Sequence, residues 1–92
     1  MRQTIPAGQD LEHAVLQVIA ANIAEFMPGI DPARVSIAGK LADYGCNSID
    51  RMDIVWKTLD DLQLDIPVTE FGAVHDLRGL VTLLCGFIGR RN

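Results

Sequence analysis

Three stretches of the chain carry apolar residues at three- and four-residue steps, and each stretch predicts an amphipathic helix. The first covers about residues 10–27, with Asp10 as its predicted N-cap. The second covers about residues 47–62. The third opens at Asp76 and continues into the arginines that close the chain, whose charges suit the C-terminal end of a helix.

The connection between the first two helices, residues 28–47, is long for so small a domain. It contains apolar residues that are expected to anchor it to the core: Ile30, Val35, Ile37, Leu41 and Tyr44. Single helical turns are expected near residues 40–43 and 69–71. No segment alternates with period two, so no strand is predicted. The pattern therefore predicts an all-α fold, a small bundle of three main helices plus one short helix.

Length and composition fit a single globular domain. The chain has 92 residues, of which 49% are hydrophobic and 22% charged, and this composition excludes a disordered chain. Residues 10–92 are predicted to form the domain after a lead-in of residues 1–9. The short lead-in and the early end of the sequence favour a stand-alone protein.

Charge and the reactive residues exclude several classes of function. The net charge of −4 argues against nucleic acid and favours basic partners. No apolar run approaches the ~20 residues of a membrane span, and no secretory signal is present, so a cytoplasmic monomer is expected. Cys46 and Cys85 are expected to be reduced, with Cys85 as a buried hydrophobe. His13 and His75 lack the spacing of metal ligands and are expected to be solvated or capping.

The second helix is more apolar than a small bundle requires. On a helical wheel one wide arc holds Leu62, Val55, Leu59, Met52, Trp56 and Ile49, while Ile54 falls outside it. The edge formed by Ile49, Met52 and Trp56 is flanked by Asp53 and Asp60, and apolar residues beside acids are typical of a docking surface. Trp56 is therefore predicted to be only partly buried. The alternative is that the whole arc is core and Trp56 fills a large volume.

Enzyme chemistry finds little support in the sequence. Ser48 lies outside a nucleophile elbow, and no histidine stands in a triad-like context. There is no glycine-rich phosphate loop. The acidic residues are too many and too scattered for a catalytic pair to be chosen among them.

The segment Gly45-Cys46-Asn47-Ser48-Ile49-Asp50 resembles the modification site of the acyl carrier proteins, in which Gly, a small residue, Asp and Ser precede Leu or Ile. Asn47 departs from the usual Asp. The resemblance extends over about residues 11–88 and includes the later Leu64-Asp65-Ile66-Pro67. It implies an acyl-carrier-like bundle and a 4′-phosphopantetheine arm on Ser48, whose thiol holds acyl groups. The physical setting agrees, because the N-terminus of a helix favours an attached phosphate anion.

The resemblance also implies partners and the residues that meet them. A phosphopantetheinyl transferase would attach the arm, and Gly45 would leave it room to approach. Acyl-loading and condensing enzymes would follow. The second helix would present the partner-binding residues to them: Ile49, Asp50, Met52, Asp53, Trp56 and Asp60.

A finer resemblance is to the stand-alone carriers of polyketide biosynthesis. It is greatest to donor carriers of β-branching cassettes, which hand acetyl units to a hydroxymethylglutaryl-synthase-like enzyme. The segments 47–67, 70–71 and 76–80 carry this resemblance. Two other functions stay open from the sequence. One is an unmodified helical interaction module with a carrier-like fold, and the other is a small serine-dependent enzyme.

Overall fold

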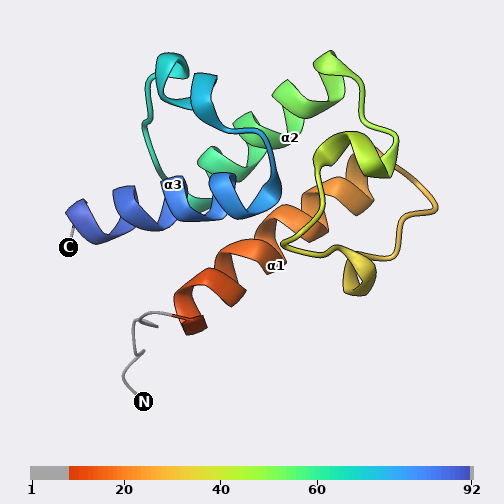
Figure 1. Ribbon diagram of the computed structural model, residues 1–92, viewed down its shortest axis with the longest axis horizontal. Helices are drawn as coiled ribbons and strands as arrows, with labels where there is room; N and C mark the ends of the chain where they lie inside the picture. The colour runs from red at the N-terminus through yellow and green to blue at the C-terminus, as the bar shows by residue number, and fades with distance from the viewer. Residues whose placement is uncertain (1–8, 92) are drawn as a thin grey trace.

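A computed structural model describes residues 9–91 and shows an all-α fold, as predicted. Its main helices are α1 (Gln9–Phe26), α2 (Ser48–Leu62) and α3 (Leu77–Arg91). In Figure 1, α1 and α2 run in opposite directions, and α3 packs against α1. No strand occurs between residues 9 and 91. The predicted lead-in lies outside the described residues except for Gln9.

Three short 3-10 helices complete the described part of the chain: η1 (Pro32–Arg34), η2 (Leu41–Tyr44) and η3 (Val68–Ala73). The turns predicted near residues 40–43 and 69–71 correspond to η2 and η3. η1 was not predicted from the sequence; the Asp31 side chain caps it by accepting a hydrogen bond from the Ala33 N–H at 2.9 Å.

The ends of the main helices follow their local sequence. Because α1 begins at Gln9, Asp10 lies in its first turn, and the prediction that Asp10 is the N-cap was wrong. The helix ends before Pro28-Gly29, where Gly29 adopts a positive φ of 101°. At the start of α3, the Asp76 carboxylate accepts a hydrogen bond from the Gly79 N–H at 2.8 Å.

The core lies where α1 contacts both α2 and α3. Ile54 is 0% exposed, so its predicted position outside the apolar face of α2 was wrong. The buried side of α2 instead contains Ile54, Thr58 and Leu59. Its opposite edge is open: Ile49 is 71% exposed, Met52 57% and Trp56 48%. The predicted partial burial of Trp56 is confirmed, and the all-core alternative is wrong.

The long connection between α1 and α2 is anchored as predicted. Val35 is buried, and Ile30, Ile37, Leu41 and Tyr44 pack against the core. The Tyr44 hydroxyl accepts a hydrogen bond from the Ser36 N–H at 2.9 Å, and the Leu77 N–H donates to the Gly39 carbonyl at 2.9 Å. The second bond ties this connection to the start of α3.

The two cysteines differ in burial. Cys46 is buried and Cys85 only partly, so the prediction that Cys85 is a buried hydrophobe was wrong in degree. Burial raises the pKa of both thiols, and both are free. His13 and His75 are exposed, as expected. No described helix is long and apolar enough to cross a membrane.

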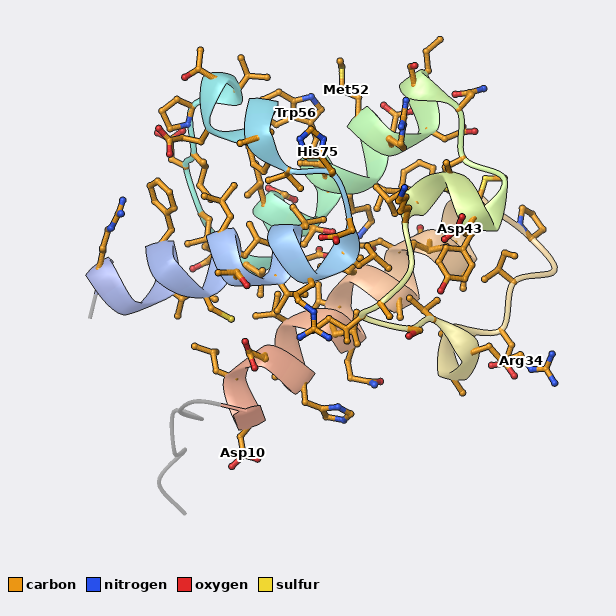
Figure 2. The ribbon with its side chains drawn as sticks, in the orientation of Figure 1. Asp10, Arg34, Asp43, Met52, Trp56 and His75 are labelled. Carbon is orange, nitrogen blue, oxygen red and sulfur yellow. The ribbon has the colours of Figure 1, made fainter. Side chains whose placement is uncertain are left out.

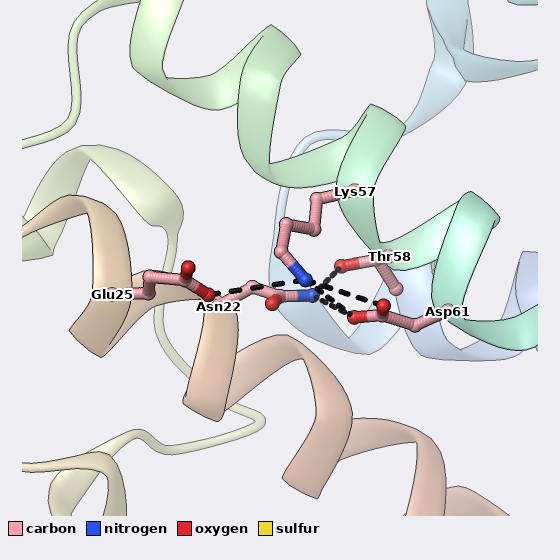
Figure 3. A network of polar contacts seen from close by, with 5 residues as sticks. All are labelled: Asn22, Glu25, Lys57, Thr58 and Asp61. Carbon is pink, nitrogen blue, oxygen red and sulfur yellow. Dashed lines mark hydrogen bonds and ion pairs between the residues drawn. The ribbon is translucent and has the colours of Figure 1, made fainter.

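A polar network joins α1 to α2 (Figure 3). The buried Asn22 amide donates to the Thr58 hydroxyl and to the Asp61 carboxylate, each at 3.0 Å. Lys57 pairs with Asp61 at 3.2 Å and with Glu25 at 3.8 Å. Because buried amides are costly without partners, this network favours one register of the two helices over others.

Acid is expected to weaken this network through Asp61. The hydrogen bonds from Asn22 and then Lys57 hold the pKa of Asp61 below its ordinary value of 3.8. A lowered folded-state pKa contributes stability above pH 3.8 that is lost as the pH falls through the folded value. The melting temperature should therefore fall more steeply with acid in the natural protein than in Asp61→Asn. Asp65→Asn, at an exposed site with no side-chain partner among residues 10–90, serves as the control and should follow the natural protein.

Candidate functional site

Ser48 is the first residue of α2, and its side chain is exposed. A capping box fixes the backbone around it. The Asn47 side chain accepts from the Asp50 N–H at 2.8 Å, and the Asp50 carboxylate accepts from the Asn47 N–H at 3.1 Å. Asn47 is thus the N-cap, and the Ser48 hydroxyl is left free of capping.

Asn47 and Gly45 have structural reasons for their identity. An amide oxygen at Asn47 caps α2 as a carboxylate would, so the departure from the usual Asp keeps the helix start while removing a negative charge beside Ser48. Gly45 adopts a φ of 85°, which side chains rarely tolerate, and a Cβ there would point at Met27 at 3.4 Å. Backbone geometry therefore favours glycine at position 45, and the room that it would leave for a transferase stays a prediction.

A cavity of about 320 Å³ opens beside Ser48. Ser48, Arg51, Met52 and Trp56 form its α2 side, and residues of η2 and η3 lie around it. The buried side chains of Leu77 and Leu80 on α3 also line it. In Figure 2, Met52 and Trp56 project from α2 toward the η3 side, with His75 beside Trp56. This cavity was not predicted from the sequence, because it depends on how η3 and α3 are placed relative to α2.

Some charged side chains of α2 are held by contacts within the chain, and others are free to contact a partner. The Asp50 carboxylate closes the capping box, and Asp61 belongs to the network with α1. Asp53 and Asp60 are exposed and have no side-chain partner among residues 10–90. Of the predicted partner-binding acids, these two are free to meet a basic surface. Arg51 donates to the Ser48 hydroxyl oxygen at 3.2 Å.

The residues at this site fit a phosphopantetheine group. Ser48 offers an exposed hydroxyl, Arg51 and Lys40 offer positive charge for the phosphate, and the mostly apolar cavity adjoins the attachment point. When bound, the group supplies a thiol that carries acyl groups as thioesters.

Comparison with known proteins decides the family. A family profile described as "Phosphopantetheine attachment site" matches residues 15–84. The chain belongs to the acyl carrier protein family. It is a carrier and not a catalyst, and its cofactor is covalently attached phosphopantetheine. Carriers of this family work with phosphopantetheinyl transferases and with acyl-loading and condensing enzymes.

Two relatives of this carrier protein are informative. It is 33% identical over 70 residues to the polyketide biosynthesis acyl-carrier-protein AcpK of Bacillus subtilis (strain 168), covering 76% of this chain and 85% of AcpK. It is 27% identical over 82 residues to 3-methylorcinaldehyde synthase of Sarocladium schorii, covering 89% of this chain but 3% of the synthase. No solved structure matches the chain.

Charge reversal at Asp53 is expected to slow acylation by partner enzymes. The exposed carboxylate would steer basic surfaces toward α2, and Asp53→Lys should lower the association rate roughly threefold to tenfold at low salt. The melting temperature should change little, because Asp53 makes no side-chain contact to lose. Asp10→Lys, at the opposite end of the molecule in Figure 2, changes the net charge equally and serves as control. Association rates that do not depend on salt would contradict the steering.

Proposed function

We propose that this protein is a carrier of polyketide biosynthesis and that Ser48 bears its phosphopantetheine arm. The observation that carries the assignment is the exposed Ser48 hydroxyl at the start of α2, beside the cavity. In the attachment reaction the Ser48 oxygen forms a bond to the pantetheine-bearing phosphorus of coenzyme A. The pyrophosphate bond breaks, adenosine bisphosphate leaves, and the hydroxyl proton passes to a base of the transferase.

Peptide mapping tests the choice of Ser48. Trypsin cleaves after Lys40 and Arg51, and the peptide of residues 41–51 contains one serine and no threonine. After incubation with coenzyme A and a phosphopantetheinyl transferase, the added mass is expected on this peptide. The other candidate hydroxyls, which fall on different peptides, are Ser36, Thr58, Thr69 and Thr82. Modification of any of those peptides instead would overturn the assignment, and no modification at all would favour the unmodified interaction module.

We also propose that Ile49, Met52 and Trp56 form an apolar strip that partner enzymes contact, bordered by the acids Asp53 and Asp60. Their exposure supports the proposal, since large apolar side chains seldom gather on an open surface without a partner. The strip continues from Ser48 along the same helix. An enzyme that reaches the arm at Ser48 would therefore lie over it.

Removing the indole of Trp56 is expected to affect partners more than folding. Because Trp56 is 48% exposed, Trp56→Ala should cost roughly 1–2 kcal/mol, less than the roughly 3–5 kcal/mol for a buried aromatic. Partner turnover should fall about tenfold or more, as at aromatic positions that dominate interfaces. Phe26→Ala, on α1 and 36% exposed, is the control and should leave turnover unchanged. Global unfolding of Trp56→Ala would contradict the strip.

Within polyketide biosynthesis we propose the role of an acetyl donor for β-branching. The support is the resemblance of segments 47–67 and 76–80 to donor carriers, together with the likeness to AcpK, which is named as a polyketide carrier. The test supplies acetylated carrier to a hydroxymethylglutaryl-synthase-like enzyme with a β-ketoacyl acceptor carrier. Acetyl transfer by this enzyme is expected. If only condensing enzymes accept the acetylated carrier, the donor role is wrong and the protein is an ordinary polyketide carrier.

A further inference from the structure

We propose that Arg51 binds the phosphodiester that joins the arm to Ser48 and thereby holds the first segment of the arm beside the cavity. The proposal rests on the attachment at Ser48 proposed above. It assigns a positioning residue within this chain, separate from the surfaces that meet partner enzymes.

The guanidinium of Arg51 lies beside the atom to which the arm would be attached and has no carboxylate partner within residues 10–90. Its Nη2 donates to the Ser48 Oγ at 3.2 Å, and it forms no ion pair with any residue between 10 and 90. A guanidinium has five N–H donors, so most remain available. Lys57, the other cation of α2, differs in this respect, because Glu25 and Asp61 already neutralise it.

Three acids that are close to Ser48 in sequence or line the cavity each accept a hydrogen bond from the backbone, and none of them pairs with Arg51. The carboxylates of Asp43, Asp50 and Asp76 each accept a hydrogen bond from a backbone N–H, at Lys40, Asn47 and Gly79 respectively. Lys40 and Arg51 both line the cavity that Ser48 adjoins. Arg51 therefore lies at the attachment point and Lys40 on the cavity wall, and neither side chain has a carboxylate partner within residues 10–90. An anion at this point would fit the arrangement.

In the hydrogen bond between Arg51 and Ser48, the arginine is the donor, which suits the site both before and after the arm is attached. Arg51 can only donate, so the Ser48 Oγ accepts and its own proton stays free for a base of the transferase. After attachment, Arg51 would hold the phosphodiester, whose anionic oxygens would accept from the guanidinium N–H groups. The contact then becomes a charge-assisted pair, which is stronger than a hydrogen bond between an arginine and a neutral hydroxyl.

The test compares the phosphopantetheine-loaded natural protein with loaded Arg51→Gln and Arg34→Gln. Arg34 is exposed on η1, makes no side-chain hydrogen bond or ion pair within residues 10–90 and lies far from Met52 and Trp56 in Figure 2, so its substitution removes the same charge elsewhere. The phosphorus NMR signal is expected to shift in Arg51→Gln and to stay in place in Arg34→Gln. In the natural protein, the side-chain N–H signal of Arg51 should move on loading, and that of Arg34 should not.

The rate of loading gives a second readout. Arg51→Gln should slow attachment about threefold to fivefold, the range for an exposed charged pair, and Arg51→Lys should recover part of the loss. Identical phosphorus signals in Arg51→Gln and the natural protein would overturn the role of Arg51. Failure of the natural protein to gain the mass would instead overturn the proposed function, and intact mass shows this before any NMR measurement.

Discussion

Ile54→Ala is expected to remove much of the stability of this domain. Ile54 is 0% exposed and lies on the side of α2 that faces the core. Truncation of such a side chain loses its burial and leaves a cavity, at a cost of about 2–5 kcal/mol. Small domains have only about 5–15 kcal/mol in total, so the midpoint of chemical denaturation should fall sharply. Circular dichroism in increasing denaturant measures this change.

Ile49→Ala provides a matched control, because it makes the same chemical change on the same helix. Ile49 is 71% exposed, and the free energy of unfolding should change by no more than about 0.5 kcal/mol. A large loss at Ile49 with little loss at Ile54 would mean that α2 presents the opposite face to the core. That result would also remove the exposed strip from the account.

The contrast between these two isoleucines shows where sequence reasoning reached its limit. A helical wheel assigns the core to the densest arc of apolar residues, but α2 has apolar residues on both its buried and its exposed sides. It also buries Thr58, whose hydroxyl accepts from the Asn22 amide. A polar residue satisfied by another helix looks solvent-facing in the sequence. The predicted core face of α2 was therefore rotated about the helix axis, and it excluded Ile54.

The spans of the main helices could be predicted because their signals are local. Pro28-Gly29 ends α1, and Asp76 begins α3 through its own side chain. The partial exposure of Trp56 could also be predicted, since α2 has more apolar surface than a small bundle can bury. The capping box between Asn47 and Asp50 was within reach of the sequence, because the two residues have the required spacing.

The cavity and the contact between Arg51 and Ser48 could not be predicted from the sequence. The cavity needs residues of η2, η3 and α3 to meet α2, and no spacing along the chain encodes that arrangement. Arg51 stands three residues after Ser48, where a helix allows contact, but many such pairs point into solvent. Only the structure shows that Arg51 reaches the Ser48 hydroxyl and forms no ion pair within residues 10–90.

Ser48→Ala is expected to abolish loading completely while leaving the fold intact. The hydroxyl is the atom to which the arm would be joined, and alanine offers no substitute. The N-cap of α2 is Asn47, so the loss of stability should stay below the roughly 1 kcal/mol of a lost cap. Thermal melts of the natural protein and Ser48→Ala should nearly coincide, which separates a missing nucleophile from a missing fold.

The most direct test of this account is the intact mass of three proteins after incubation with coenzyme A and a phosphopantetheinyl transferase. They are the natural protein, Ser48→Ala and Ser36→Ala, the last of which removes a hydroxyl from the connection before α2. The natural protein and Ser36→Ala are expected to gain one phosphopantetheine group, and Ser48→Ala none. A gain of the same mass by Ser48→Ala would contradict the assignment of Ser48.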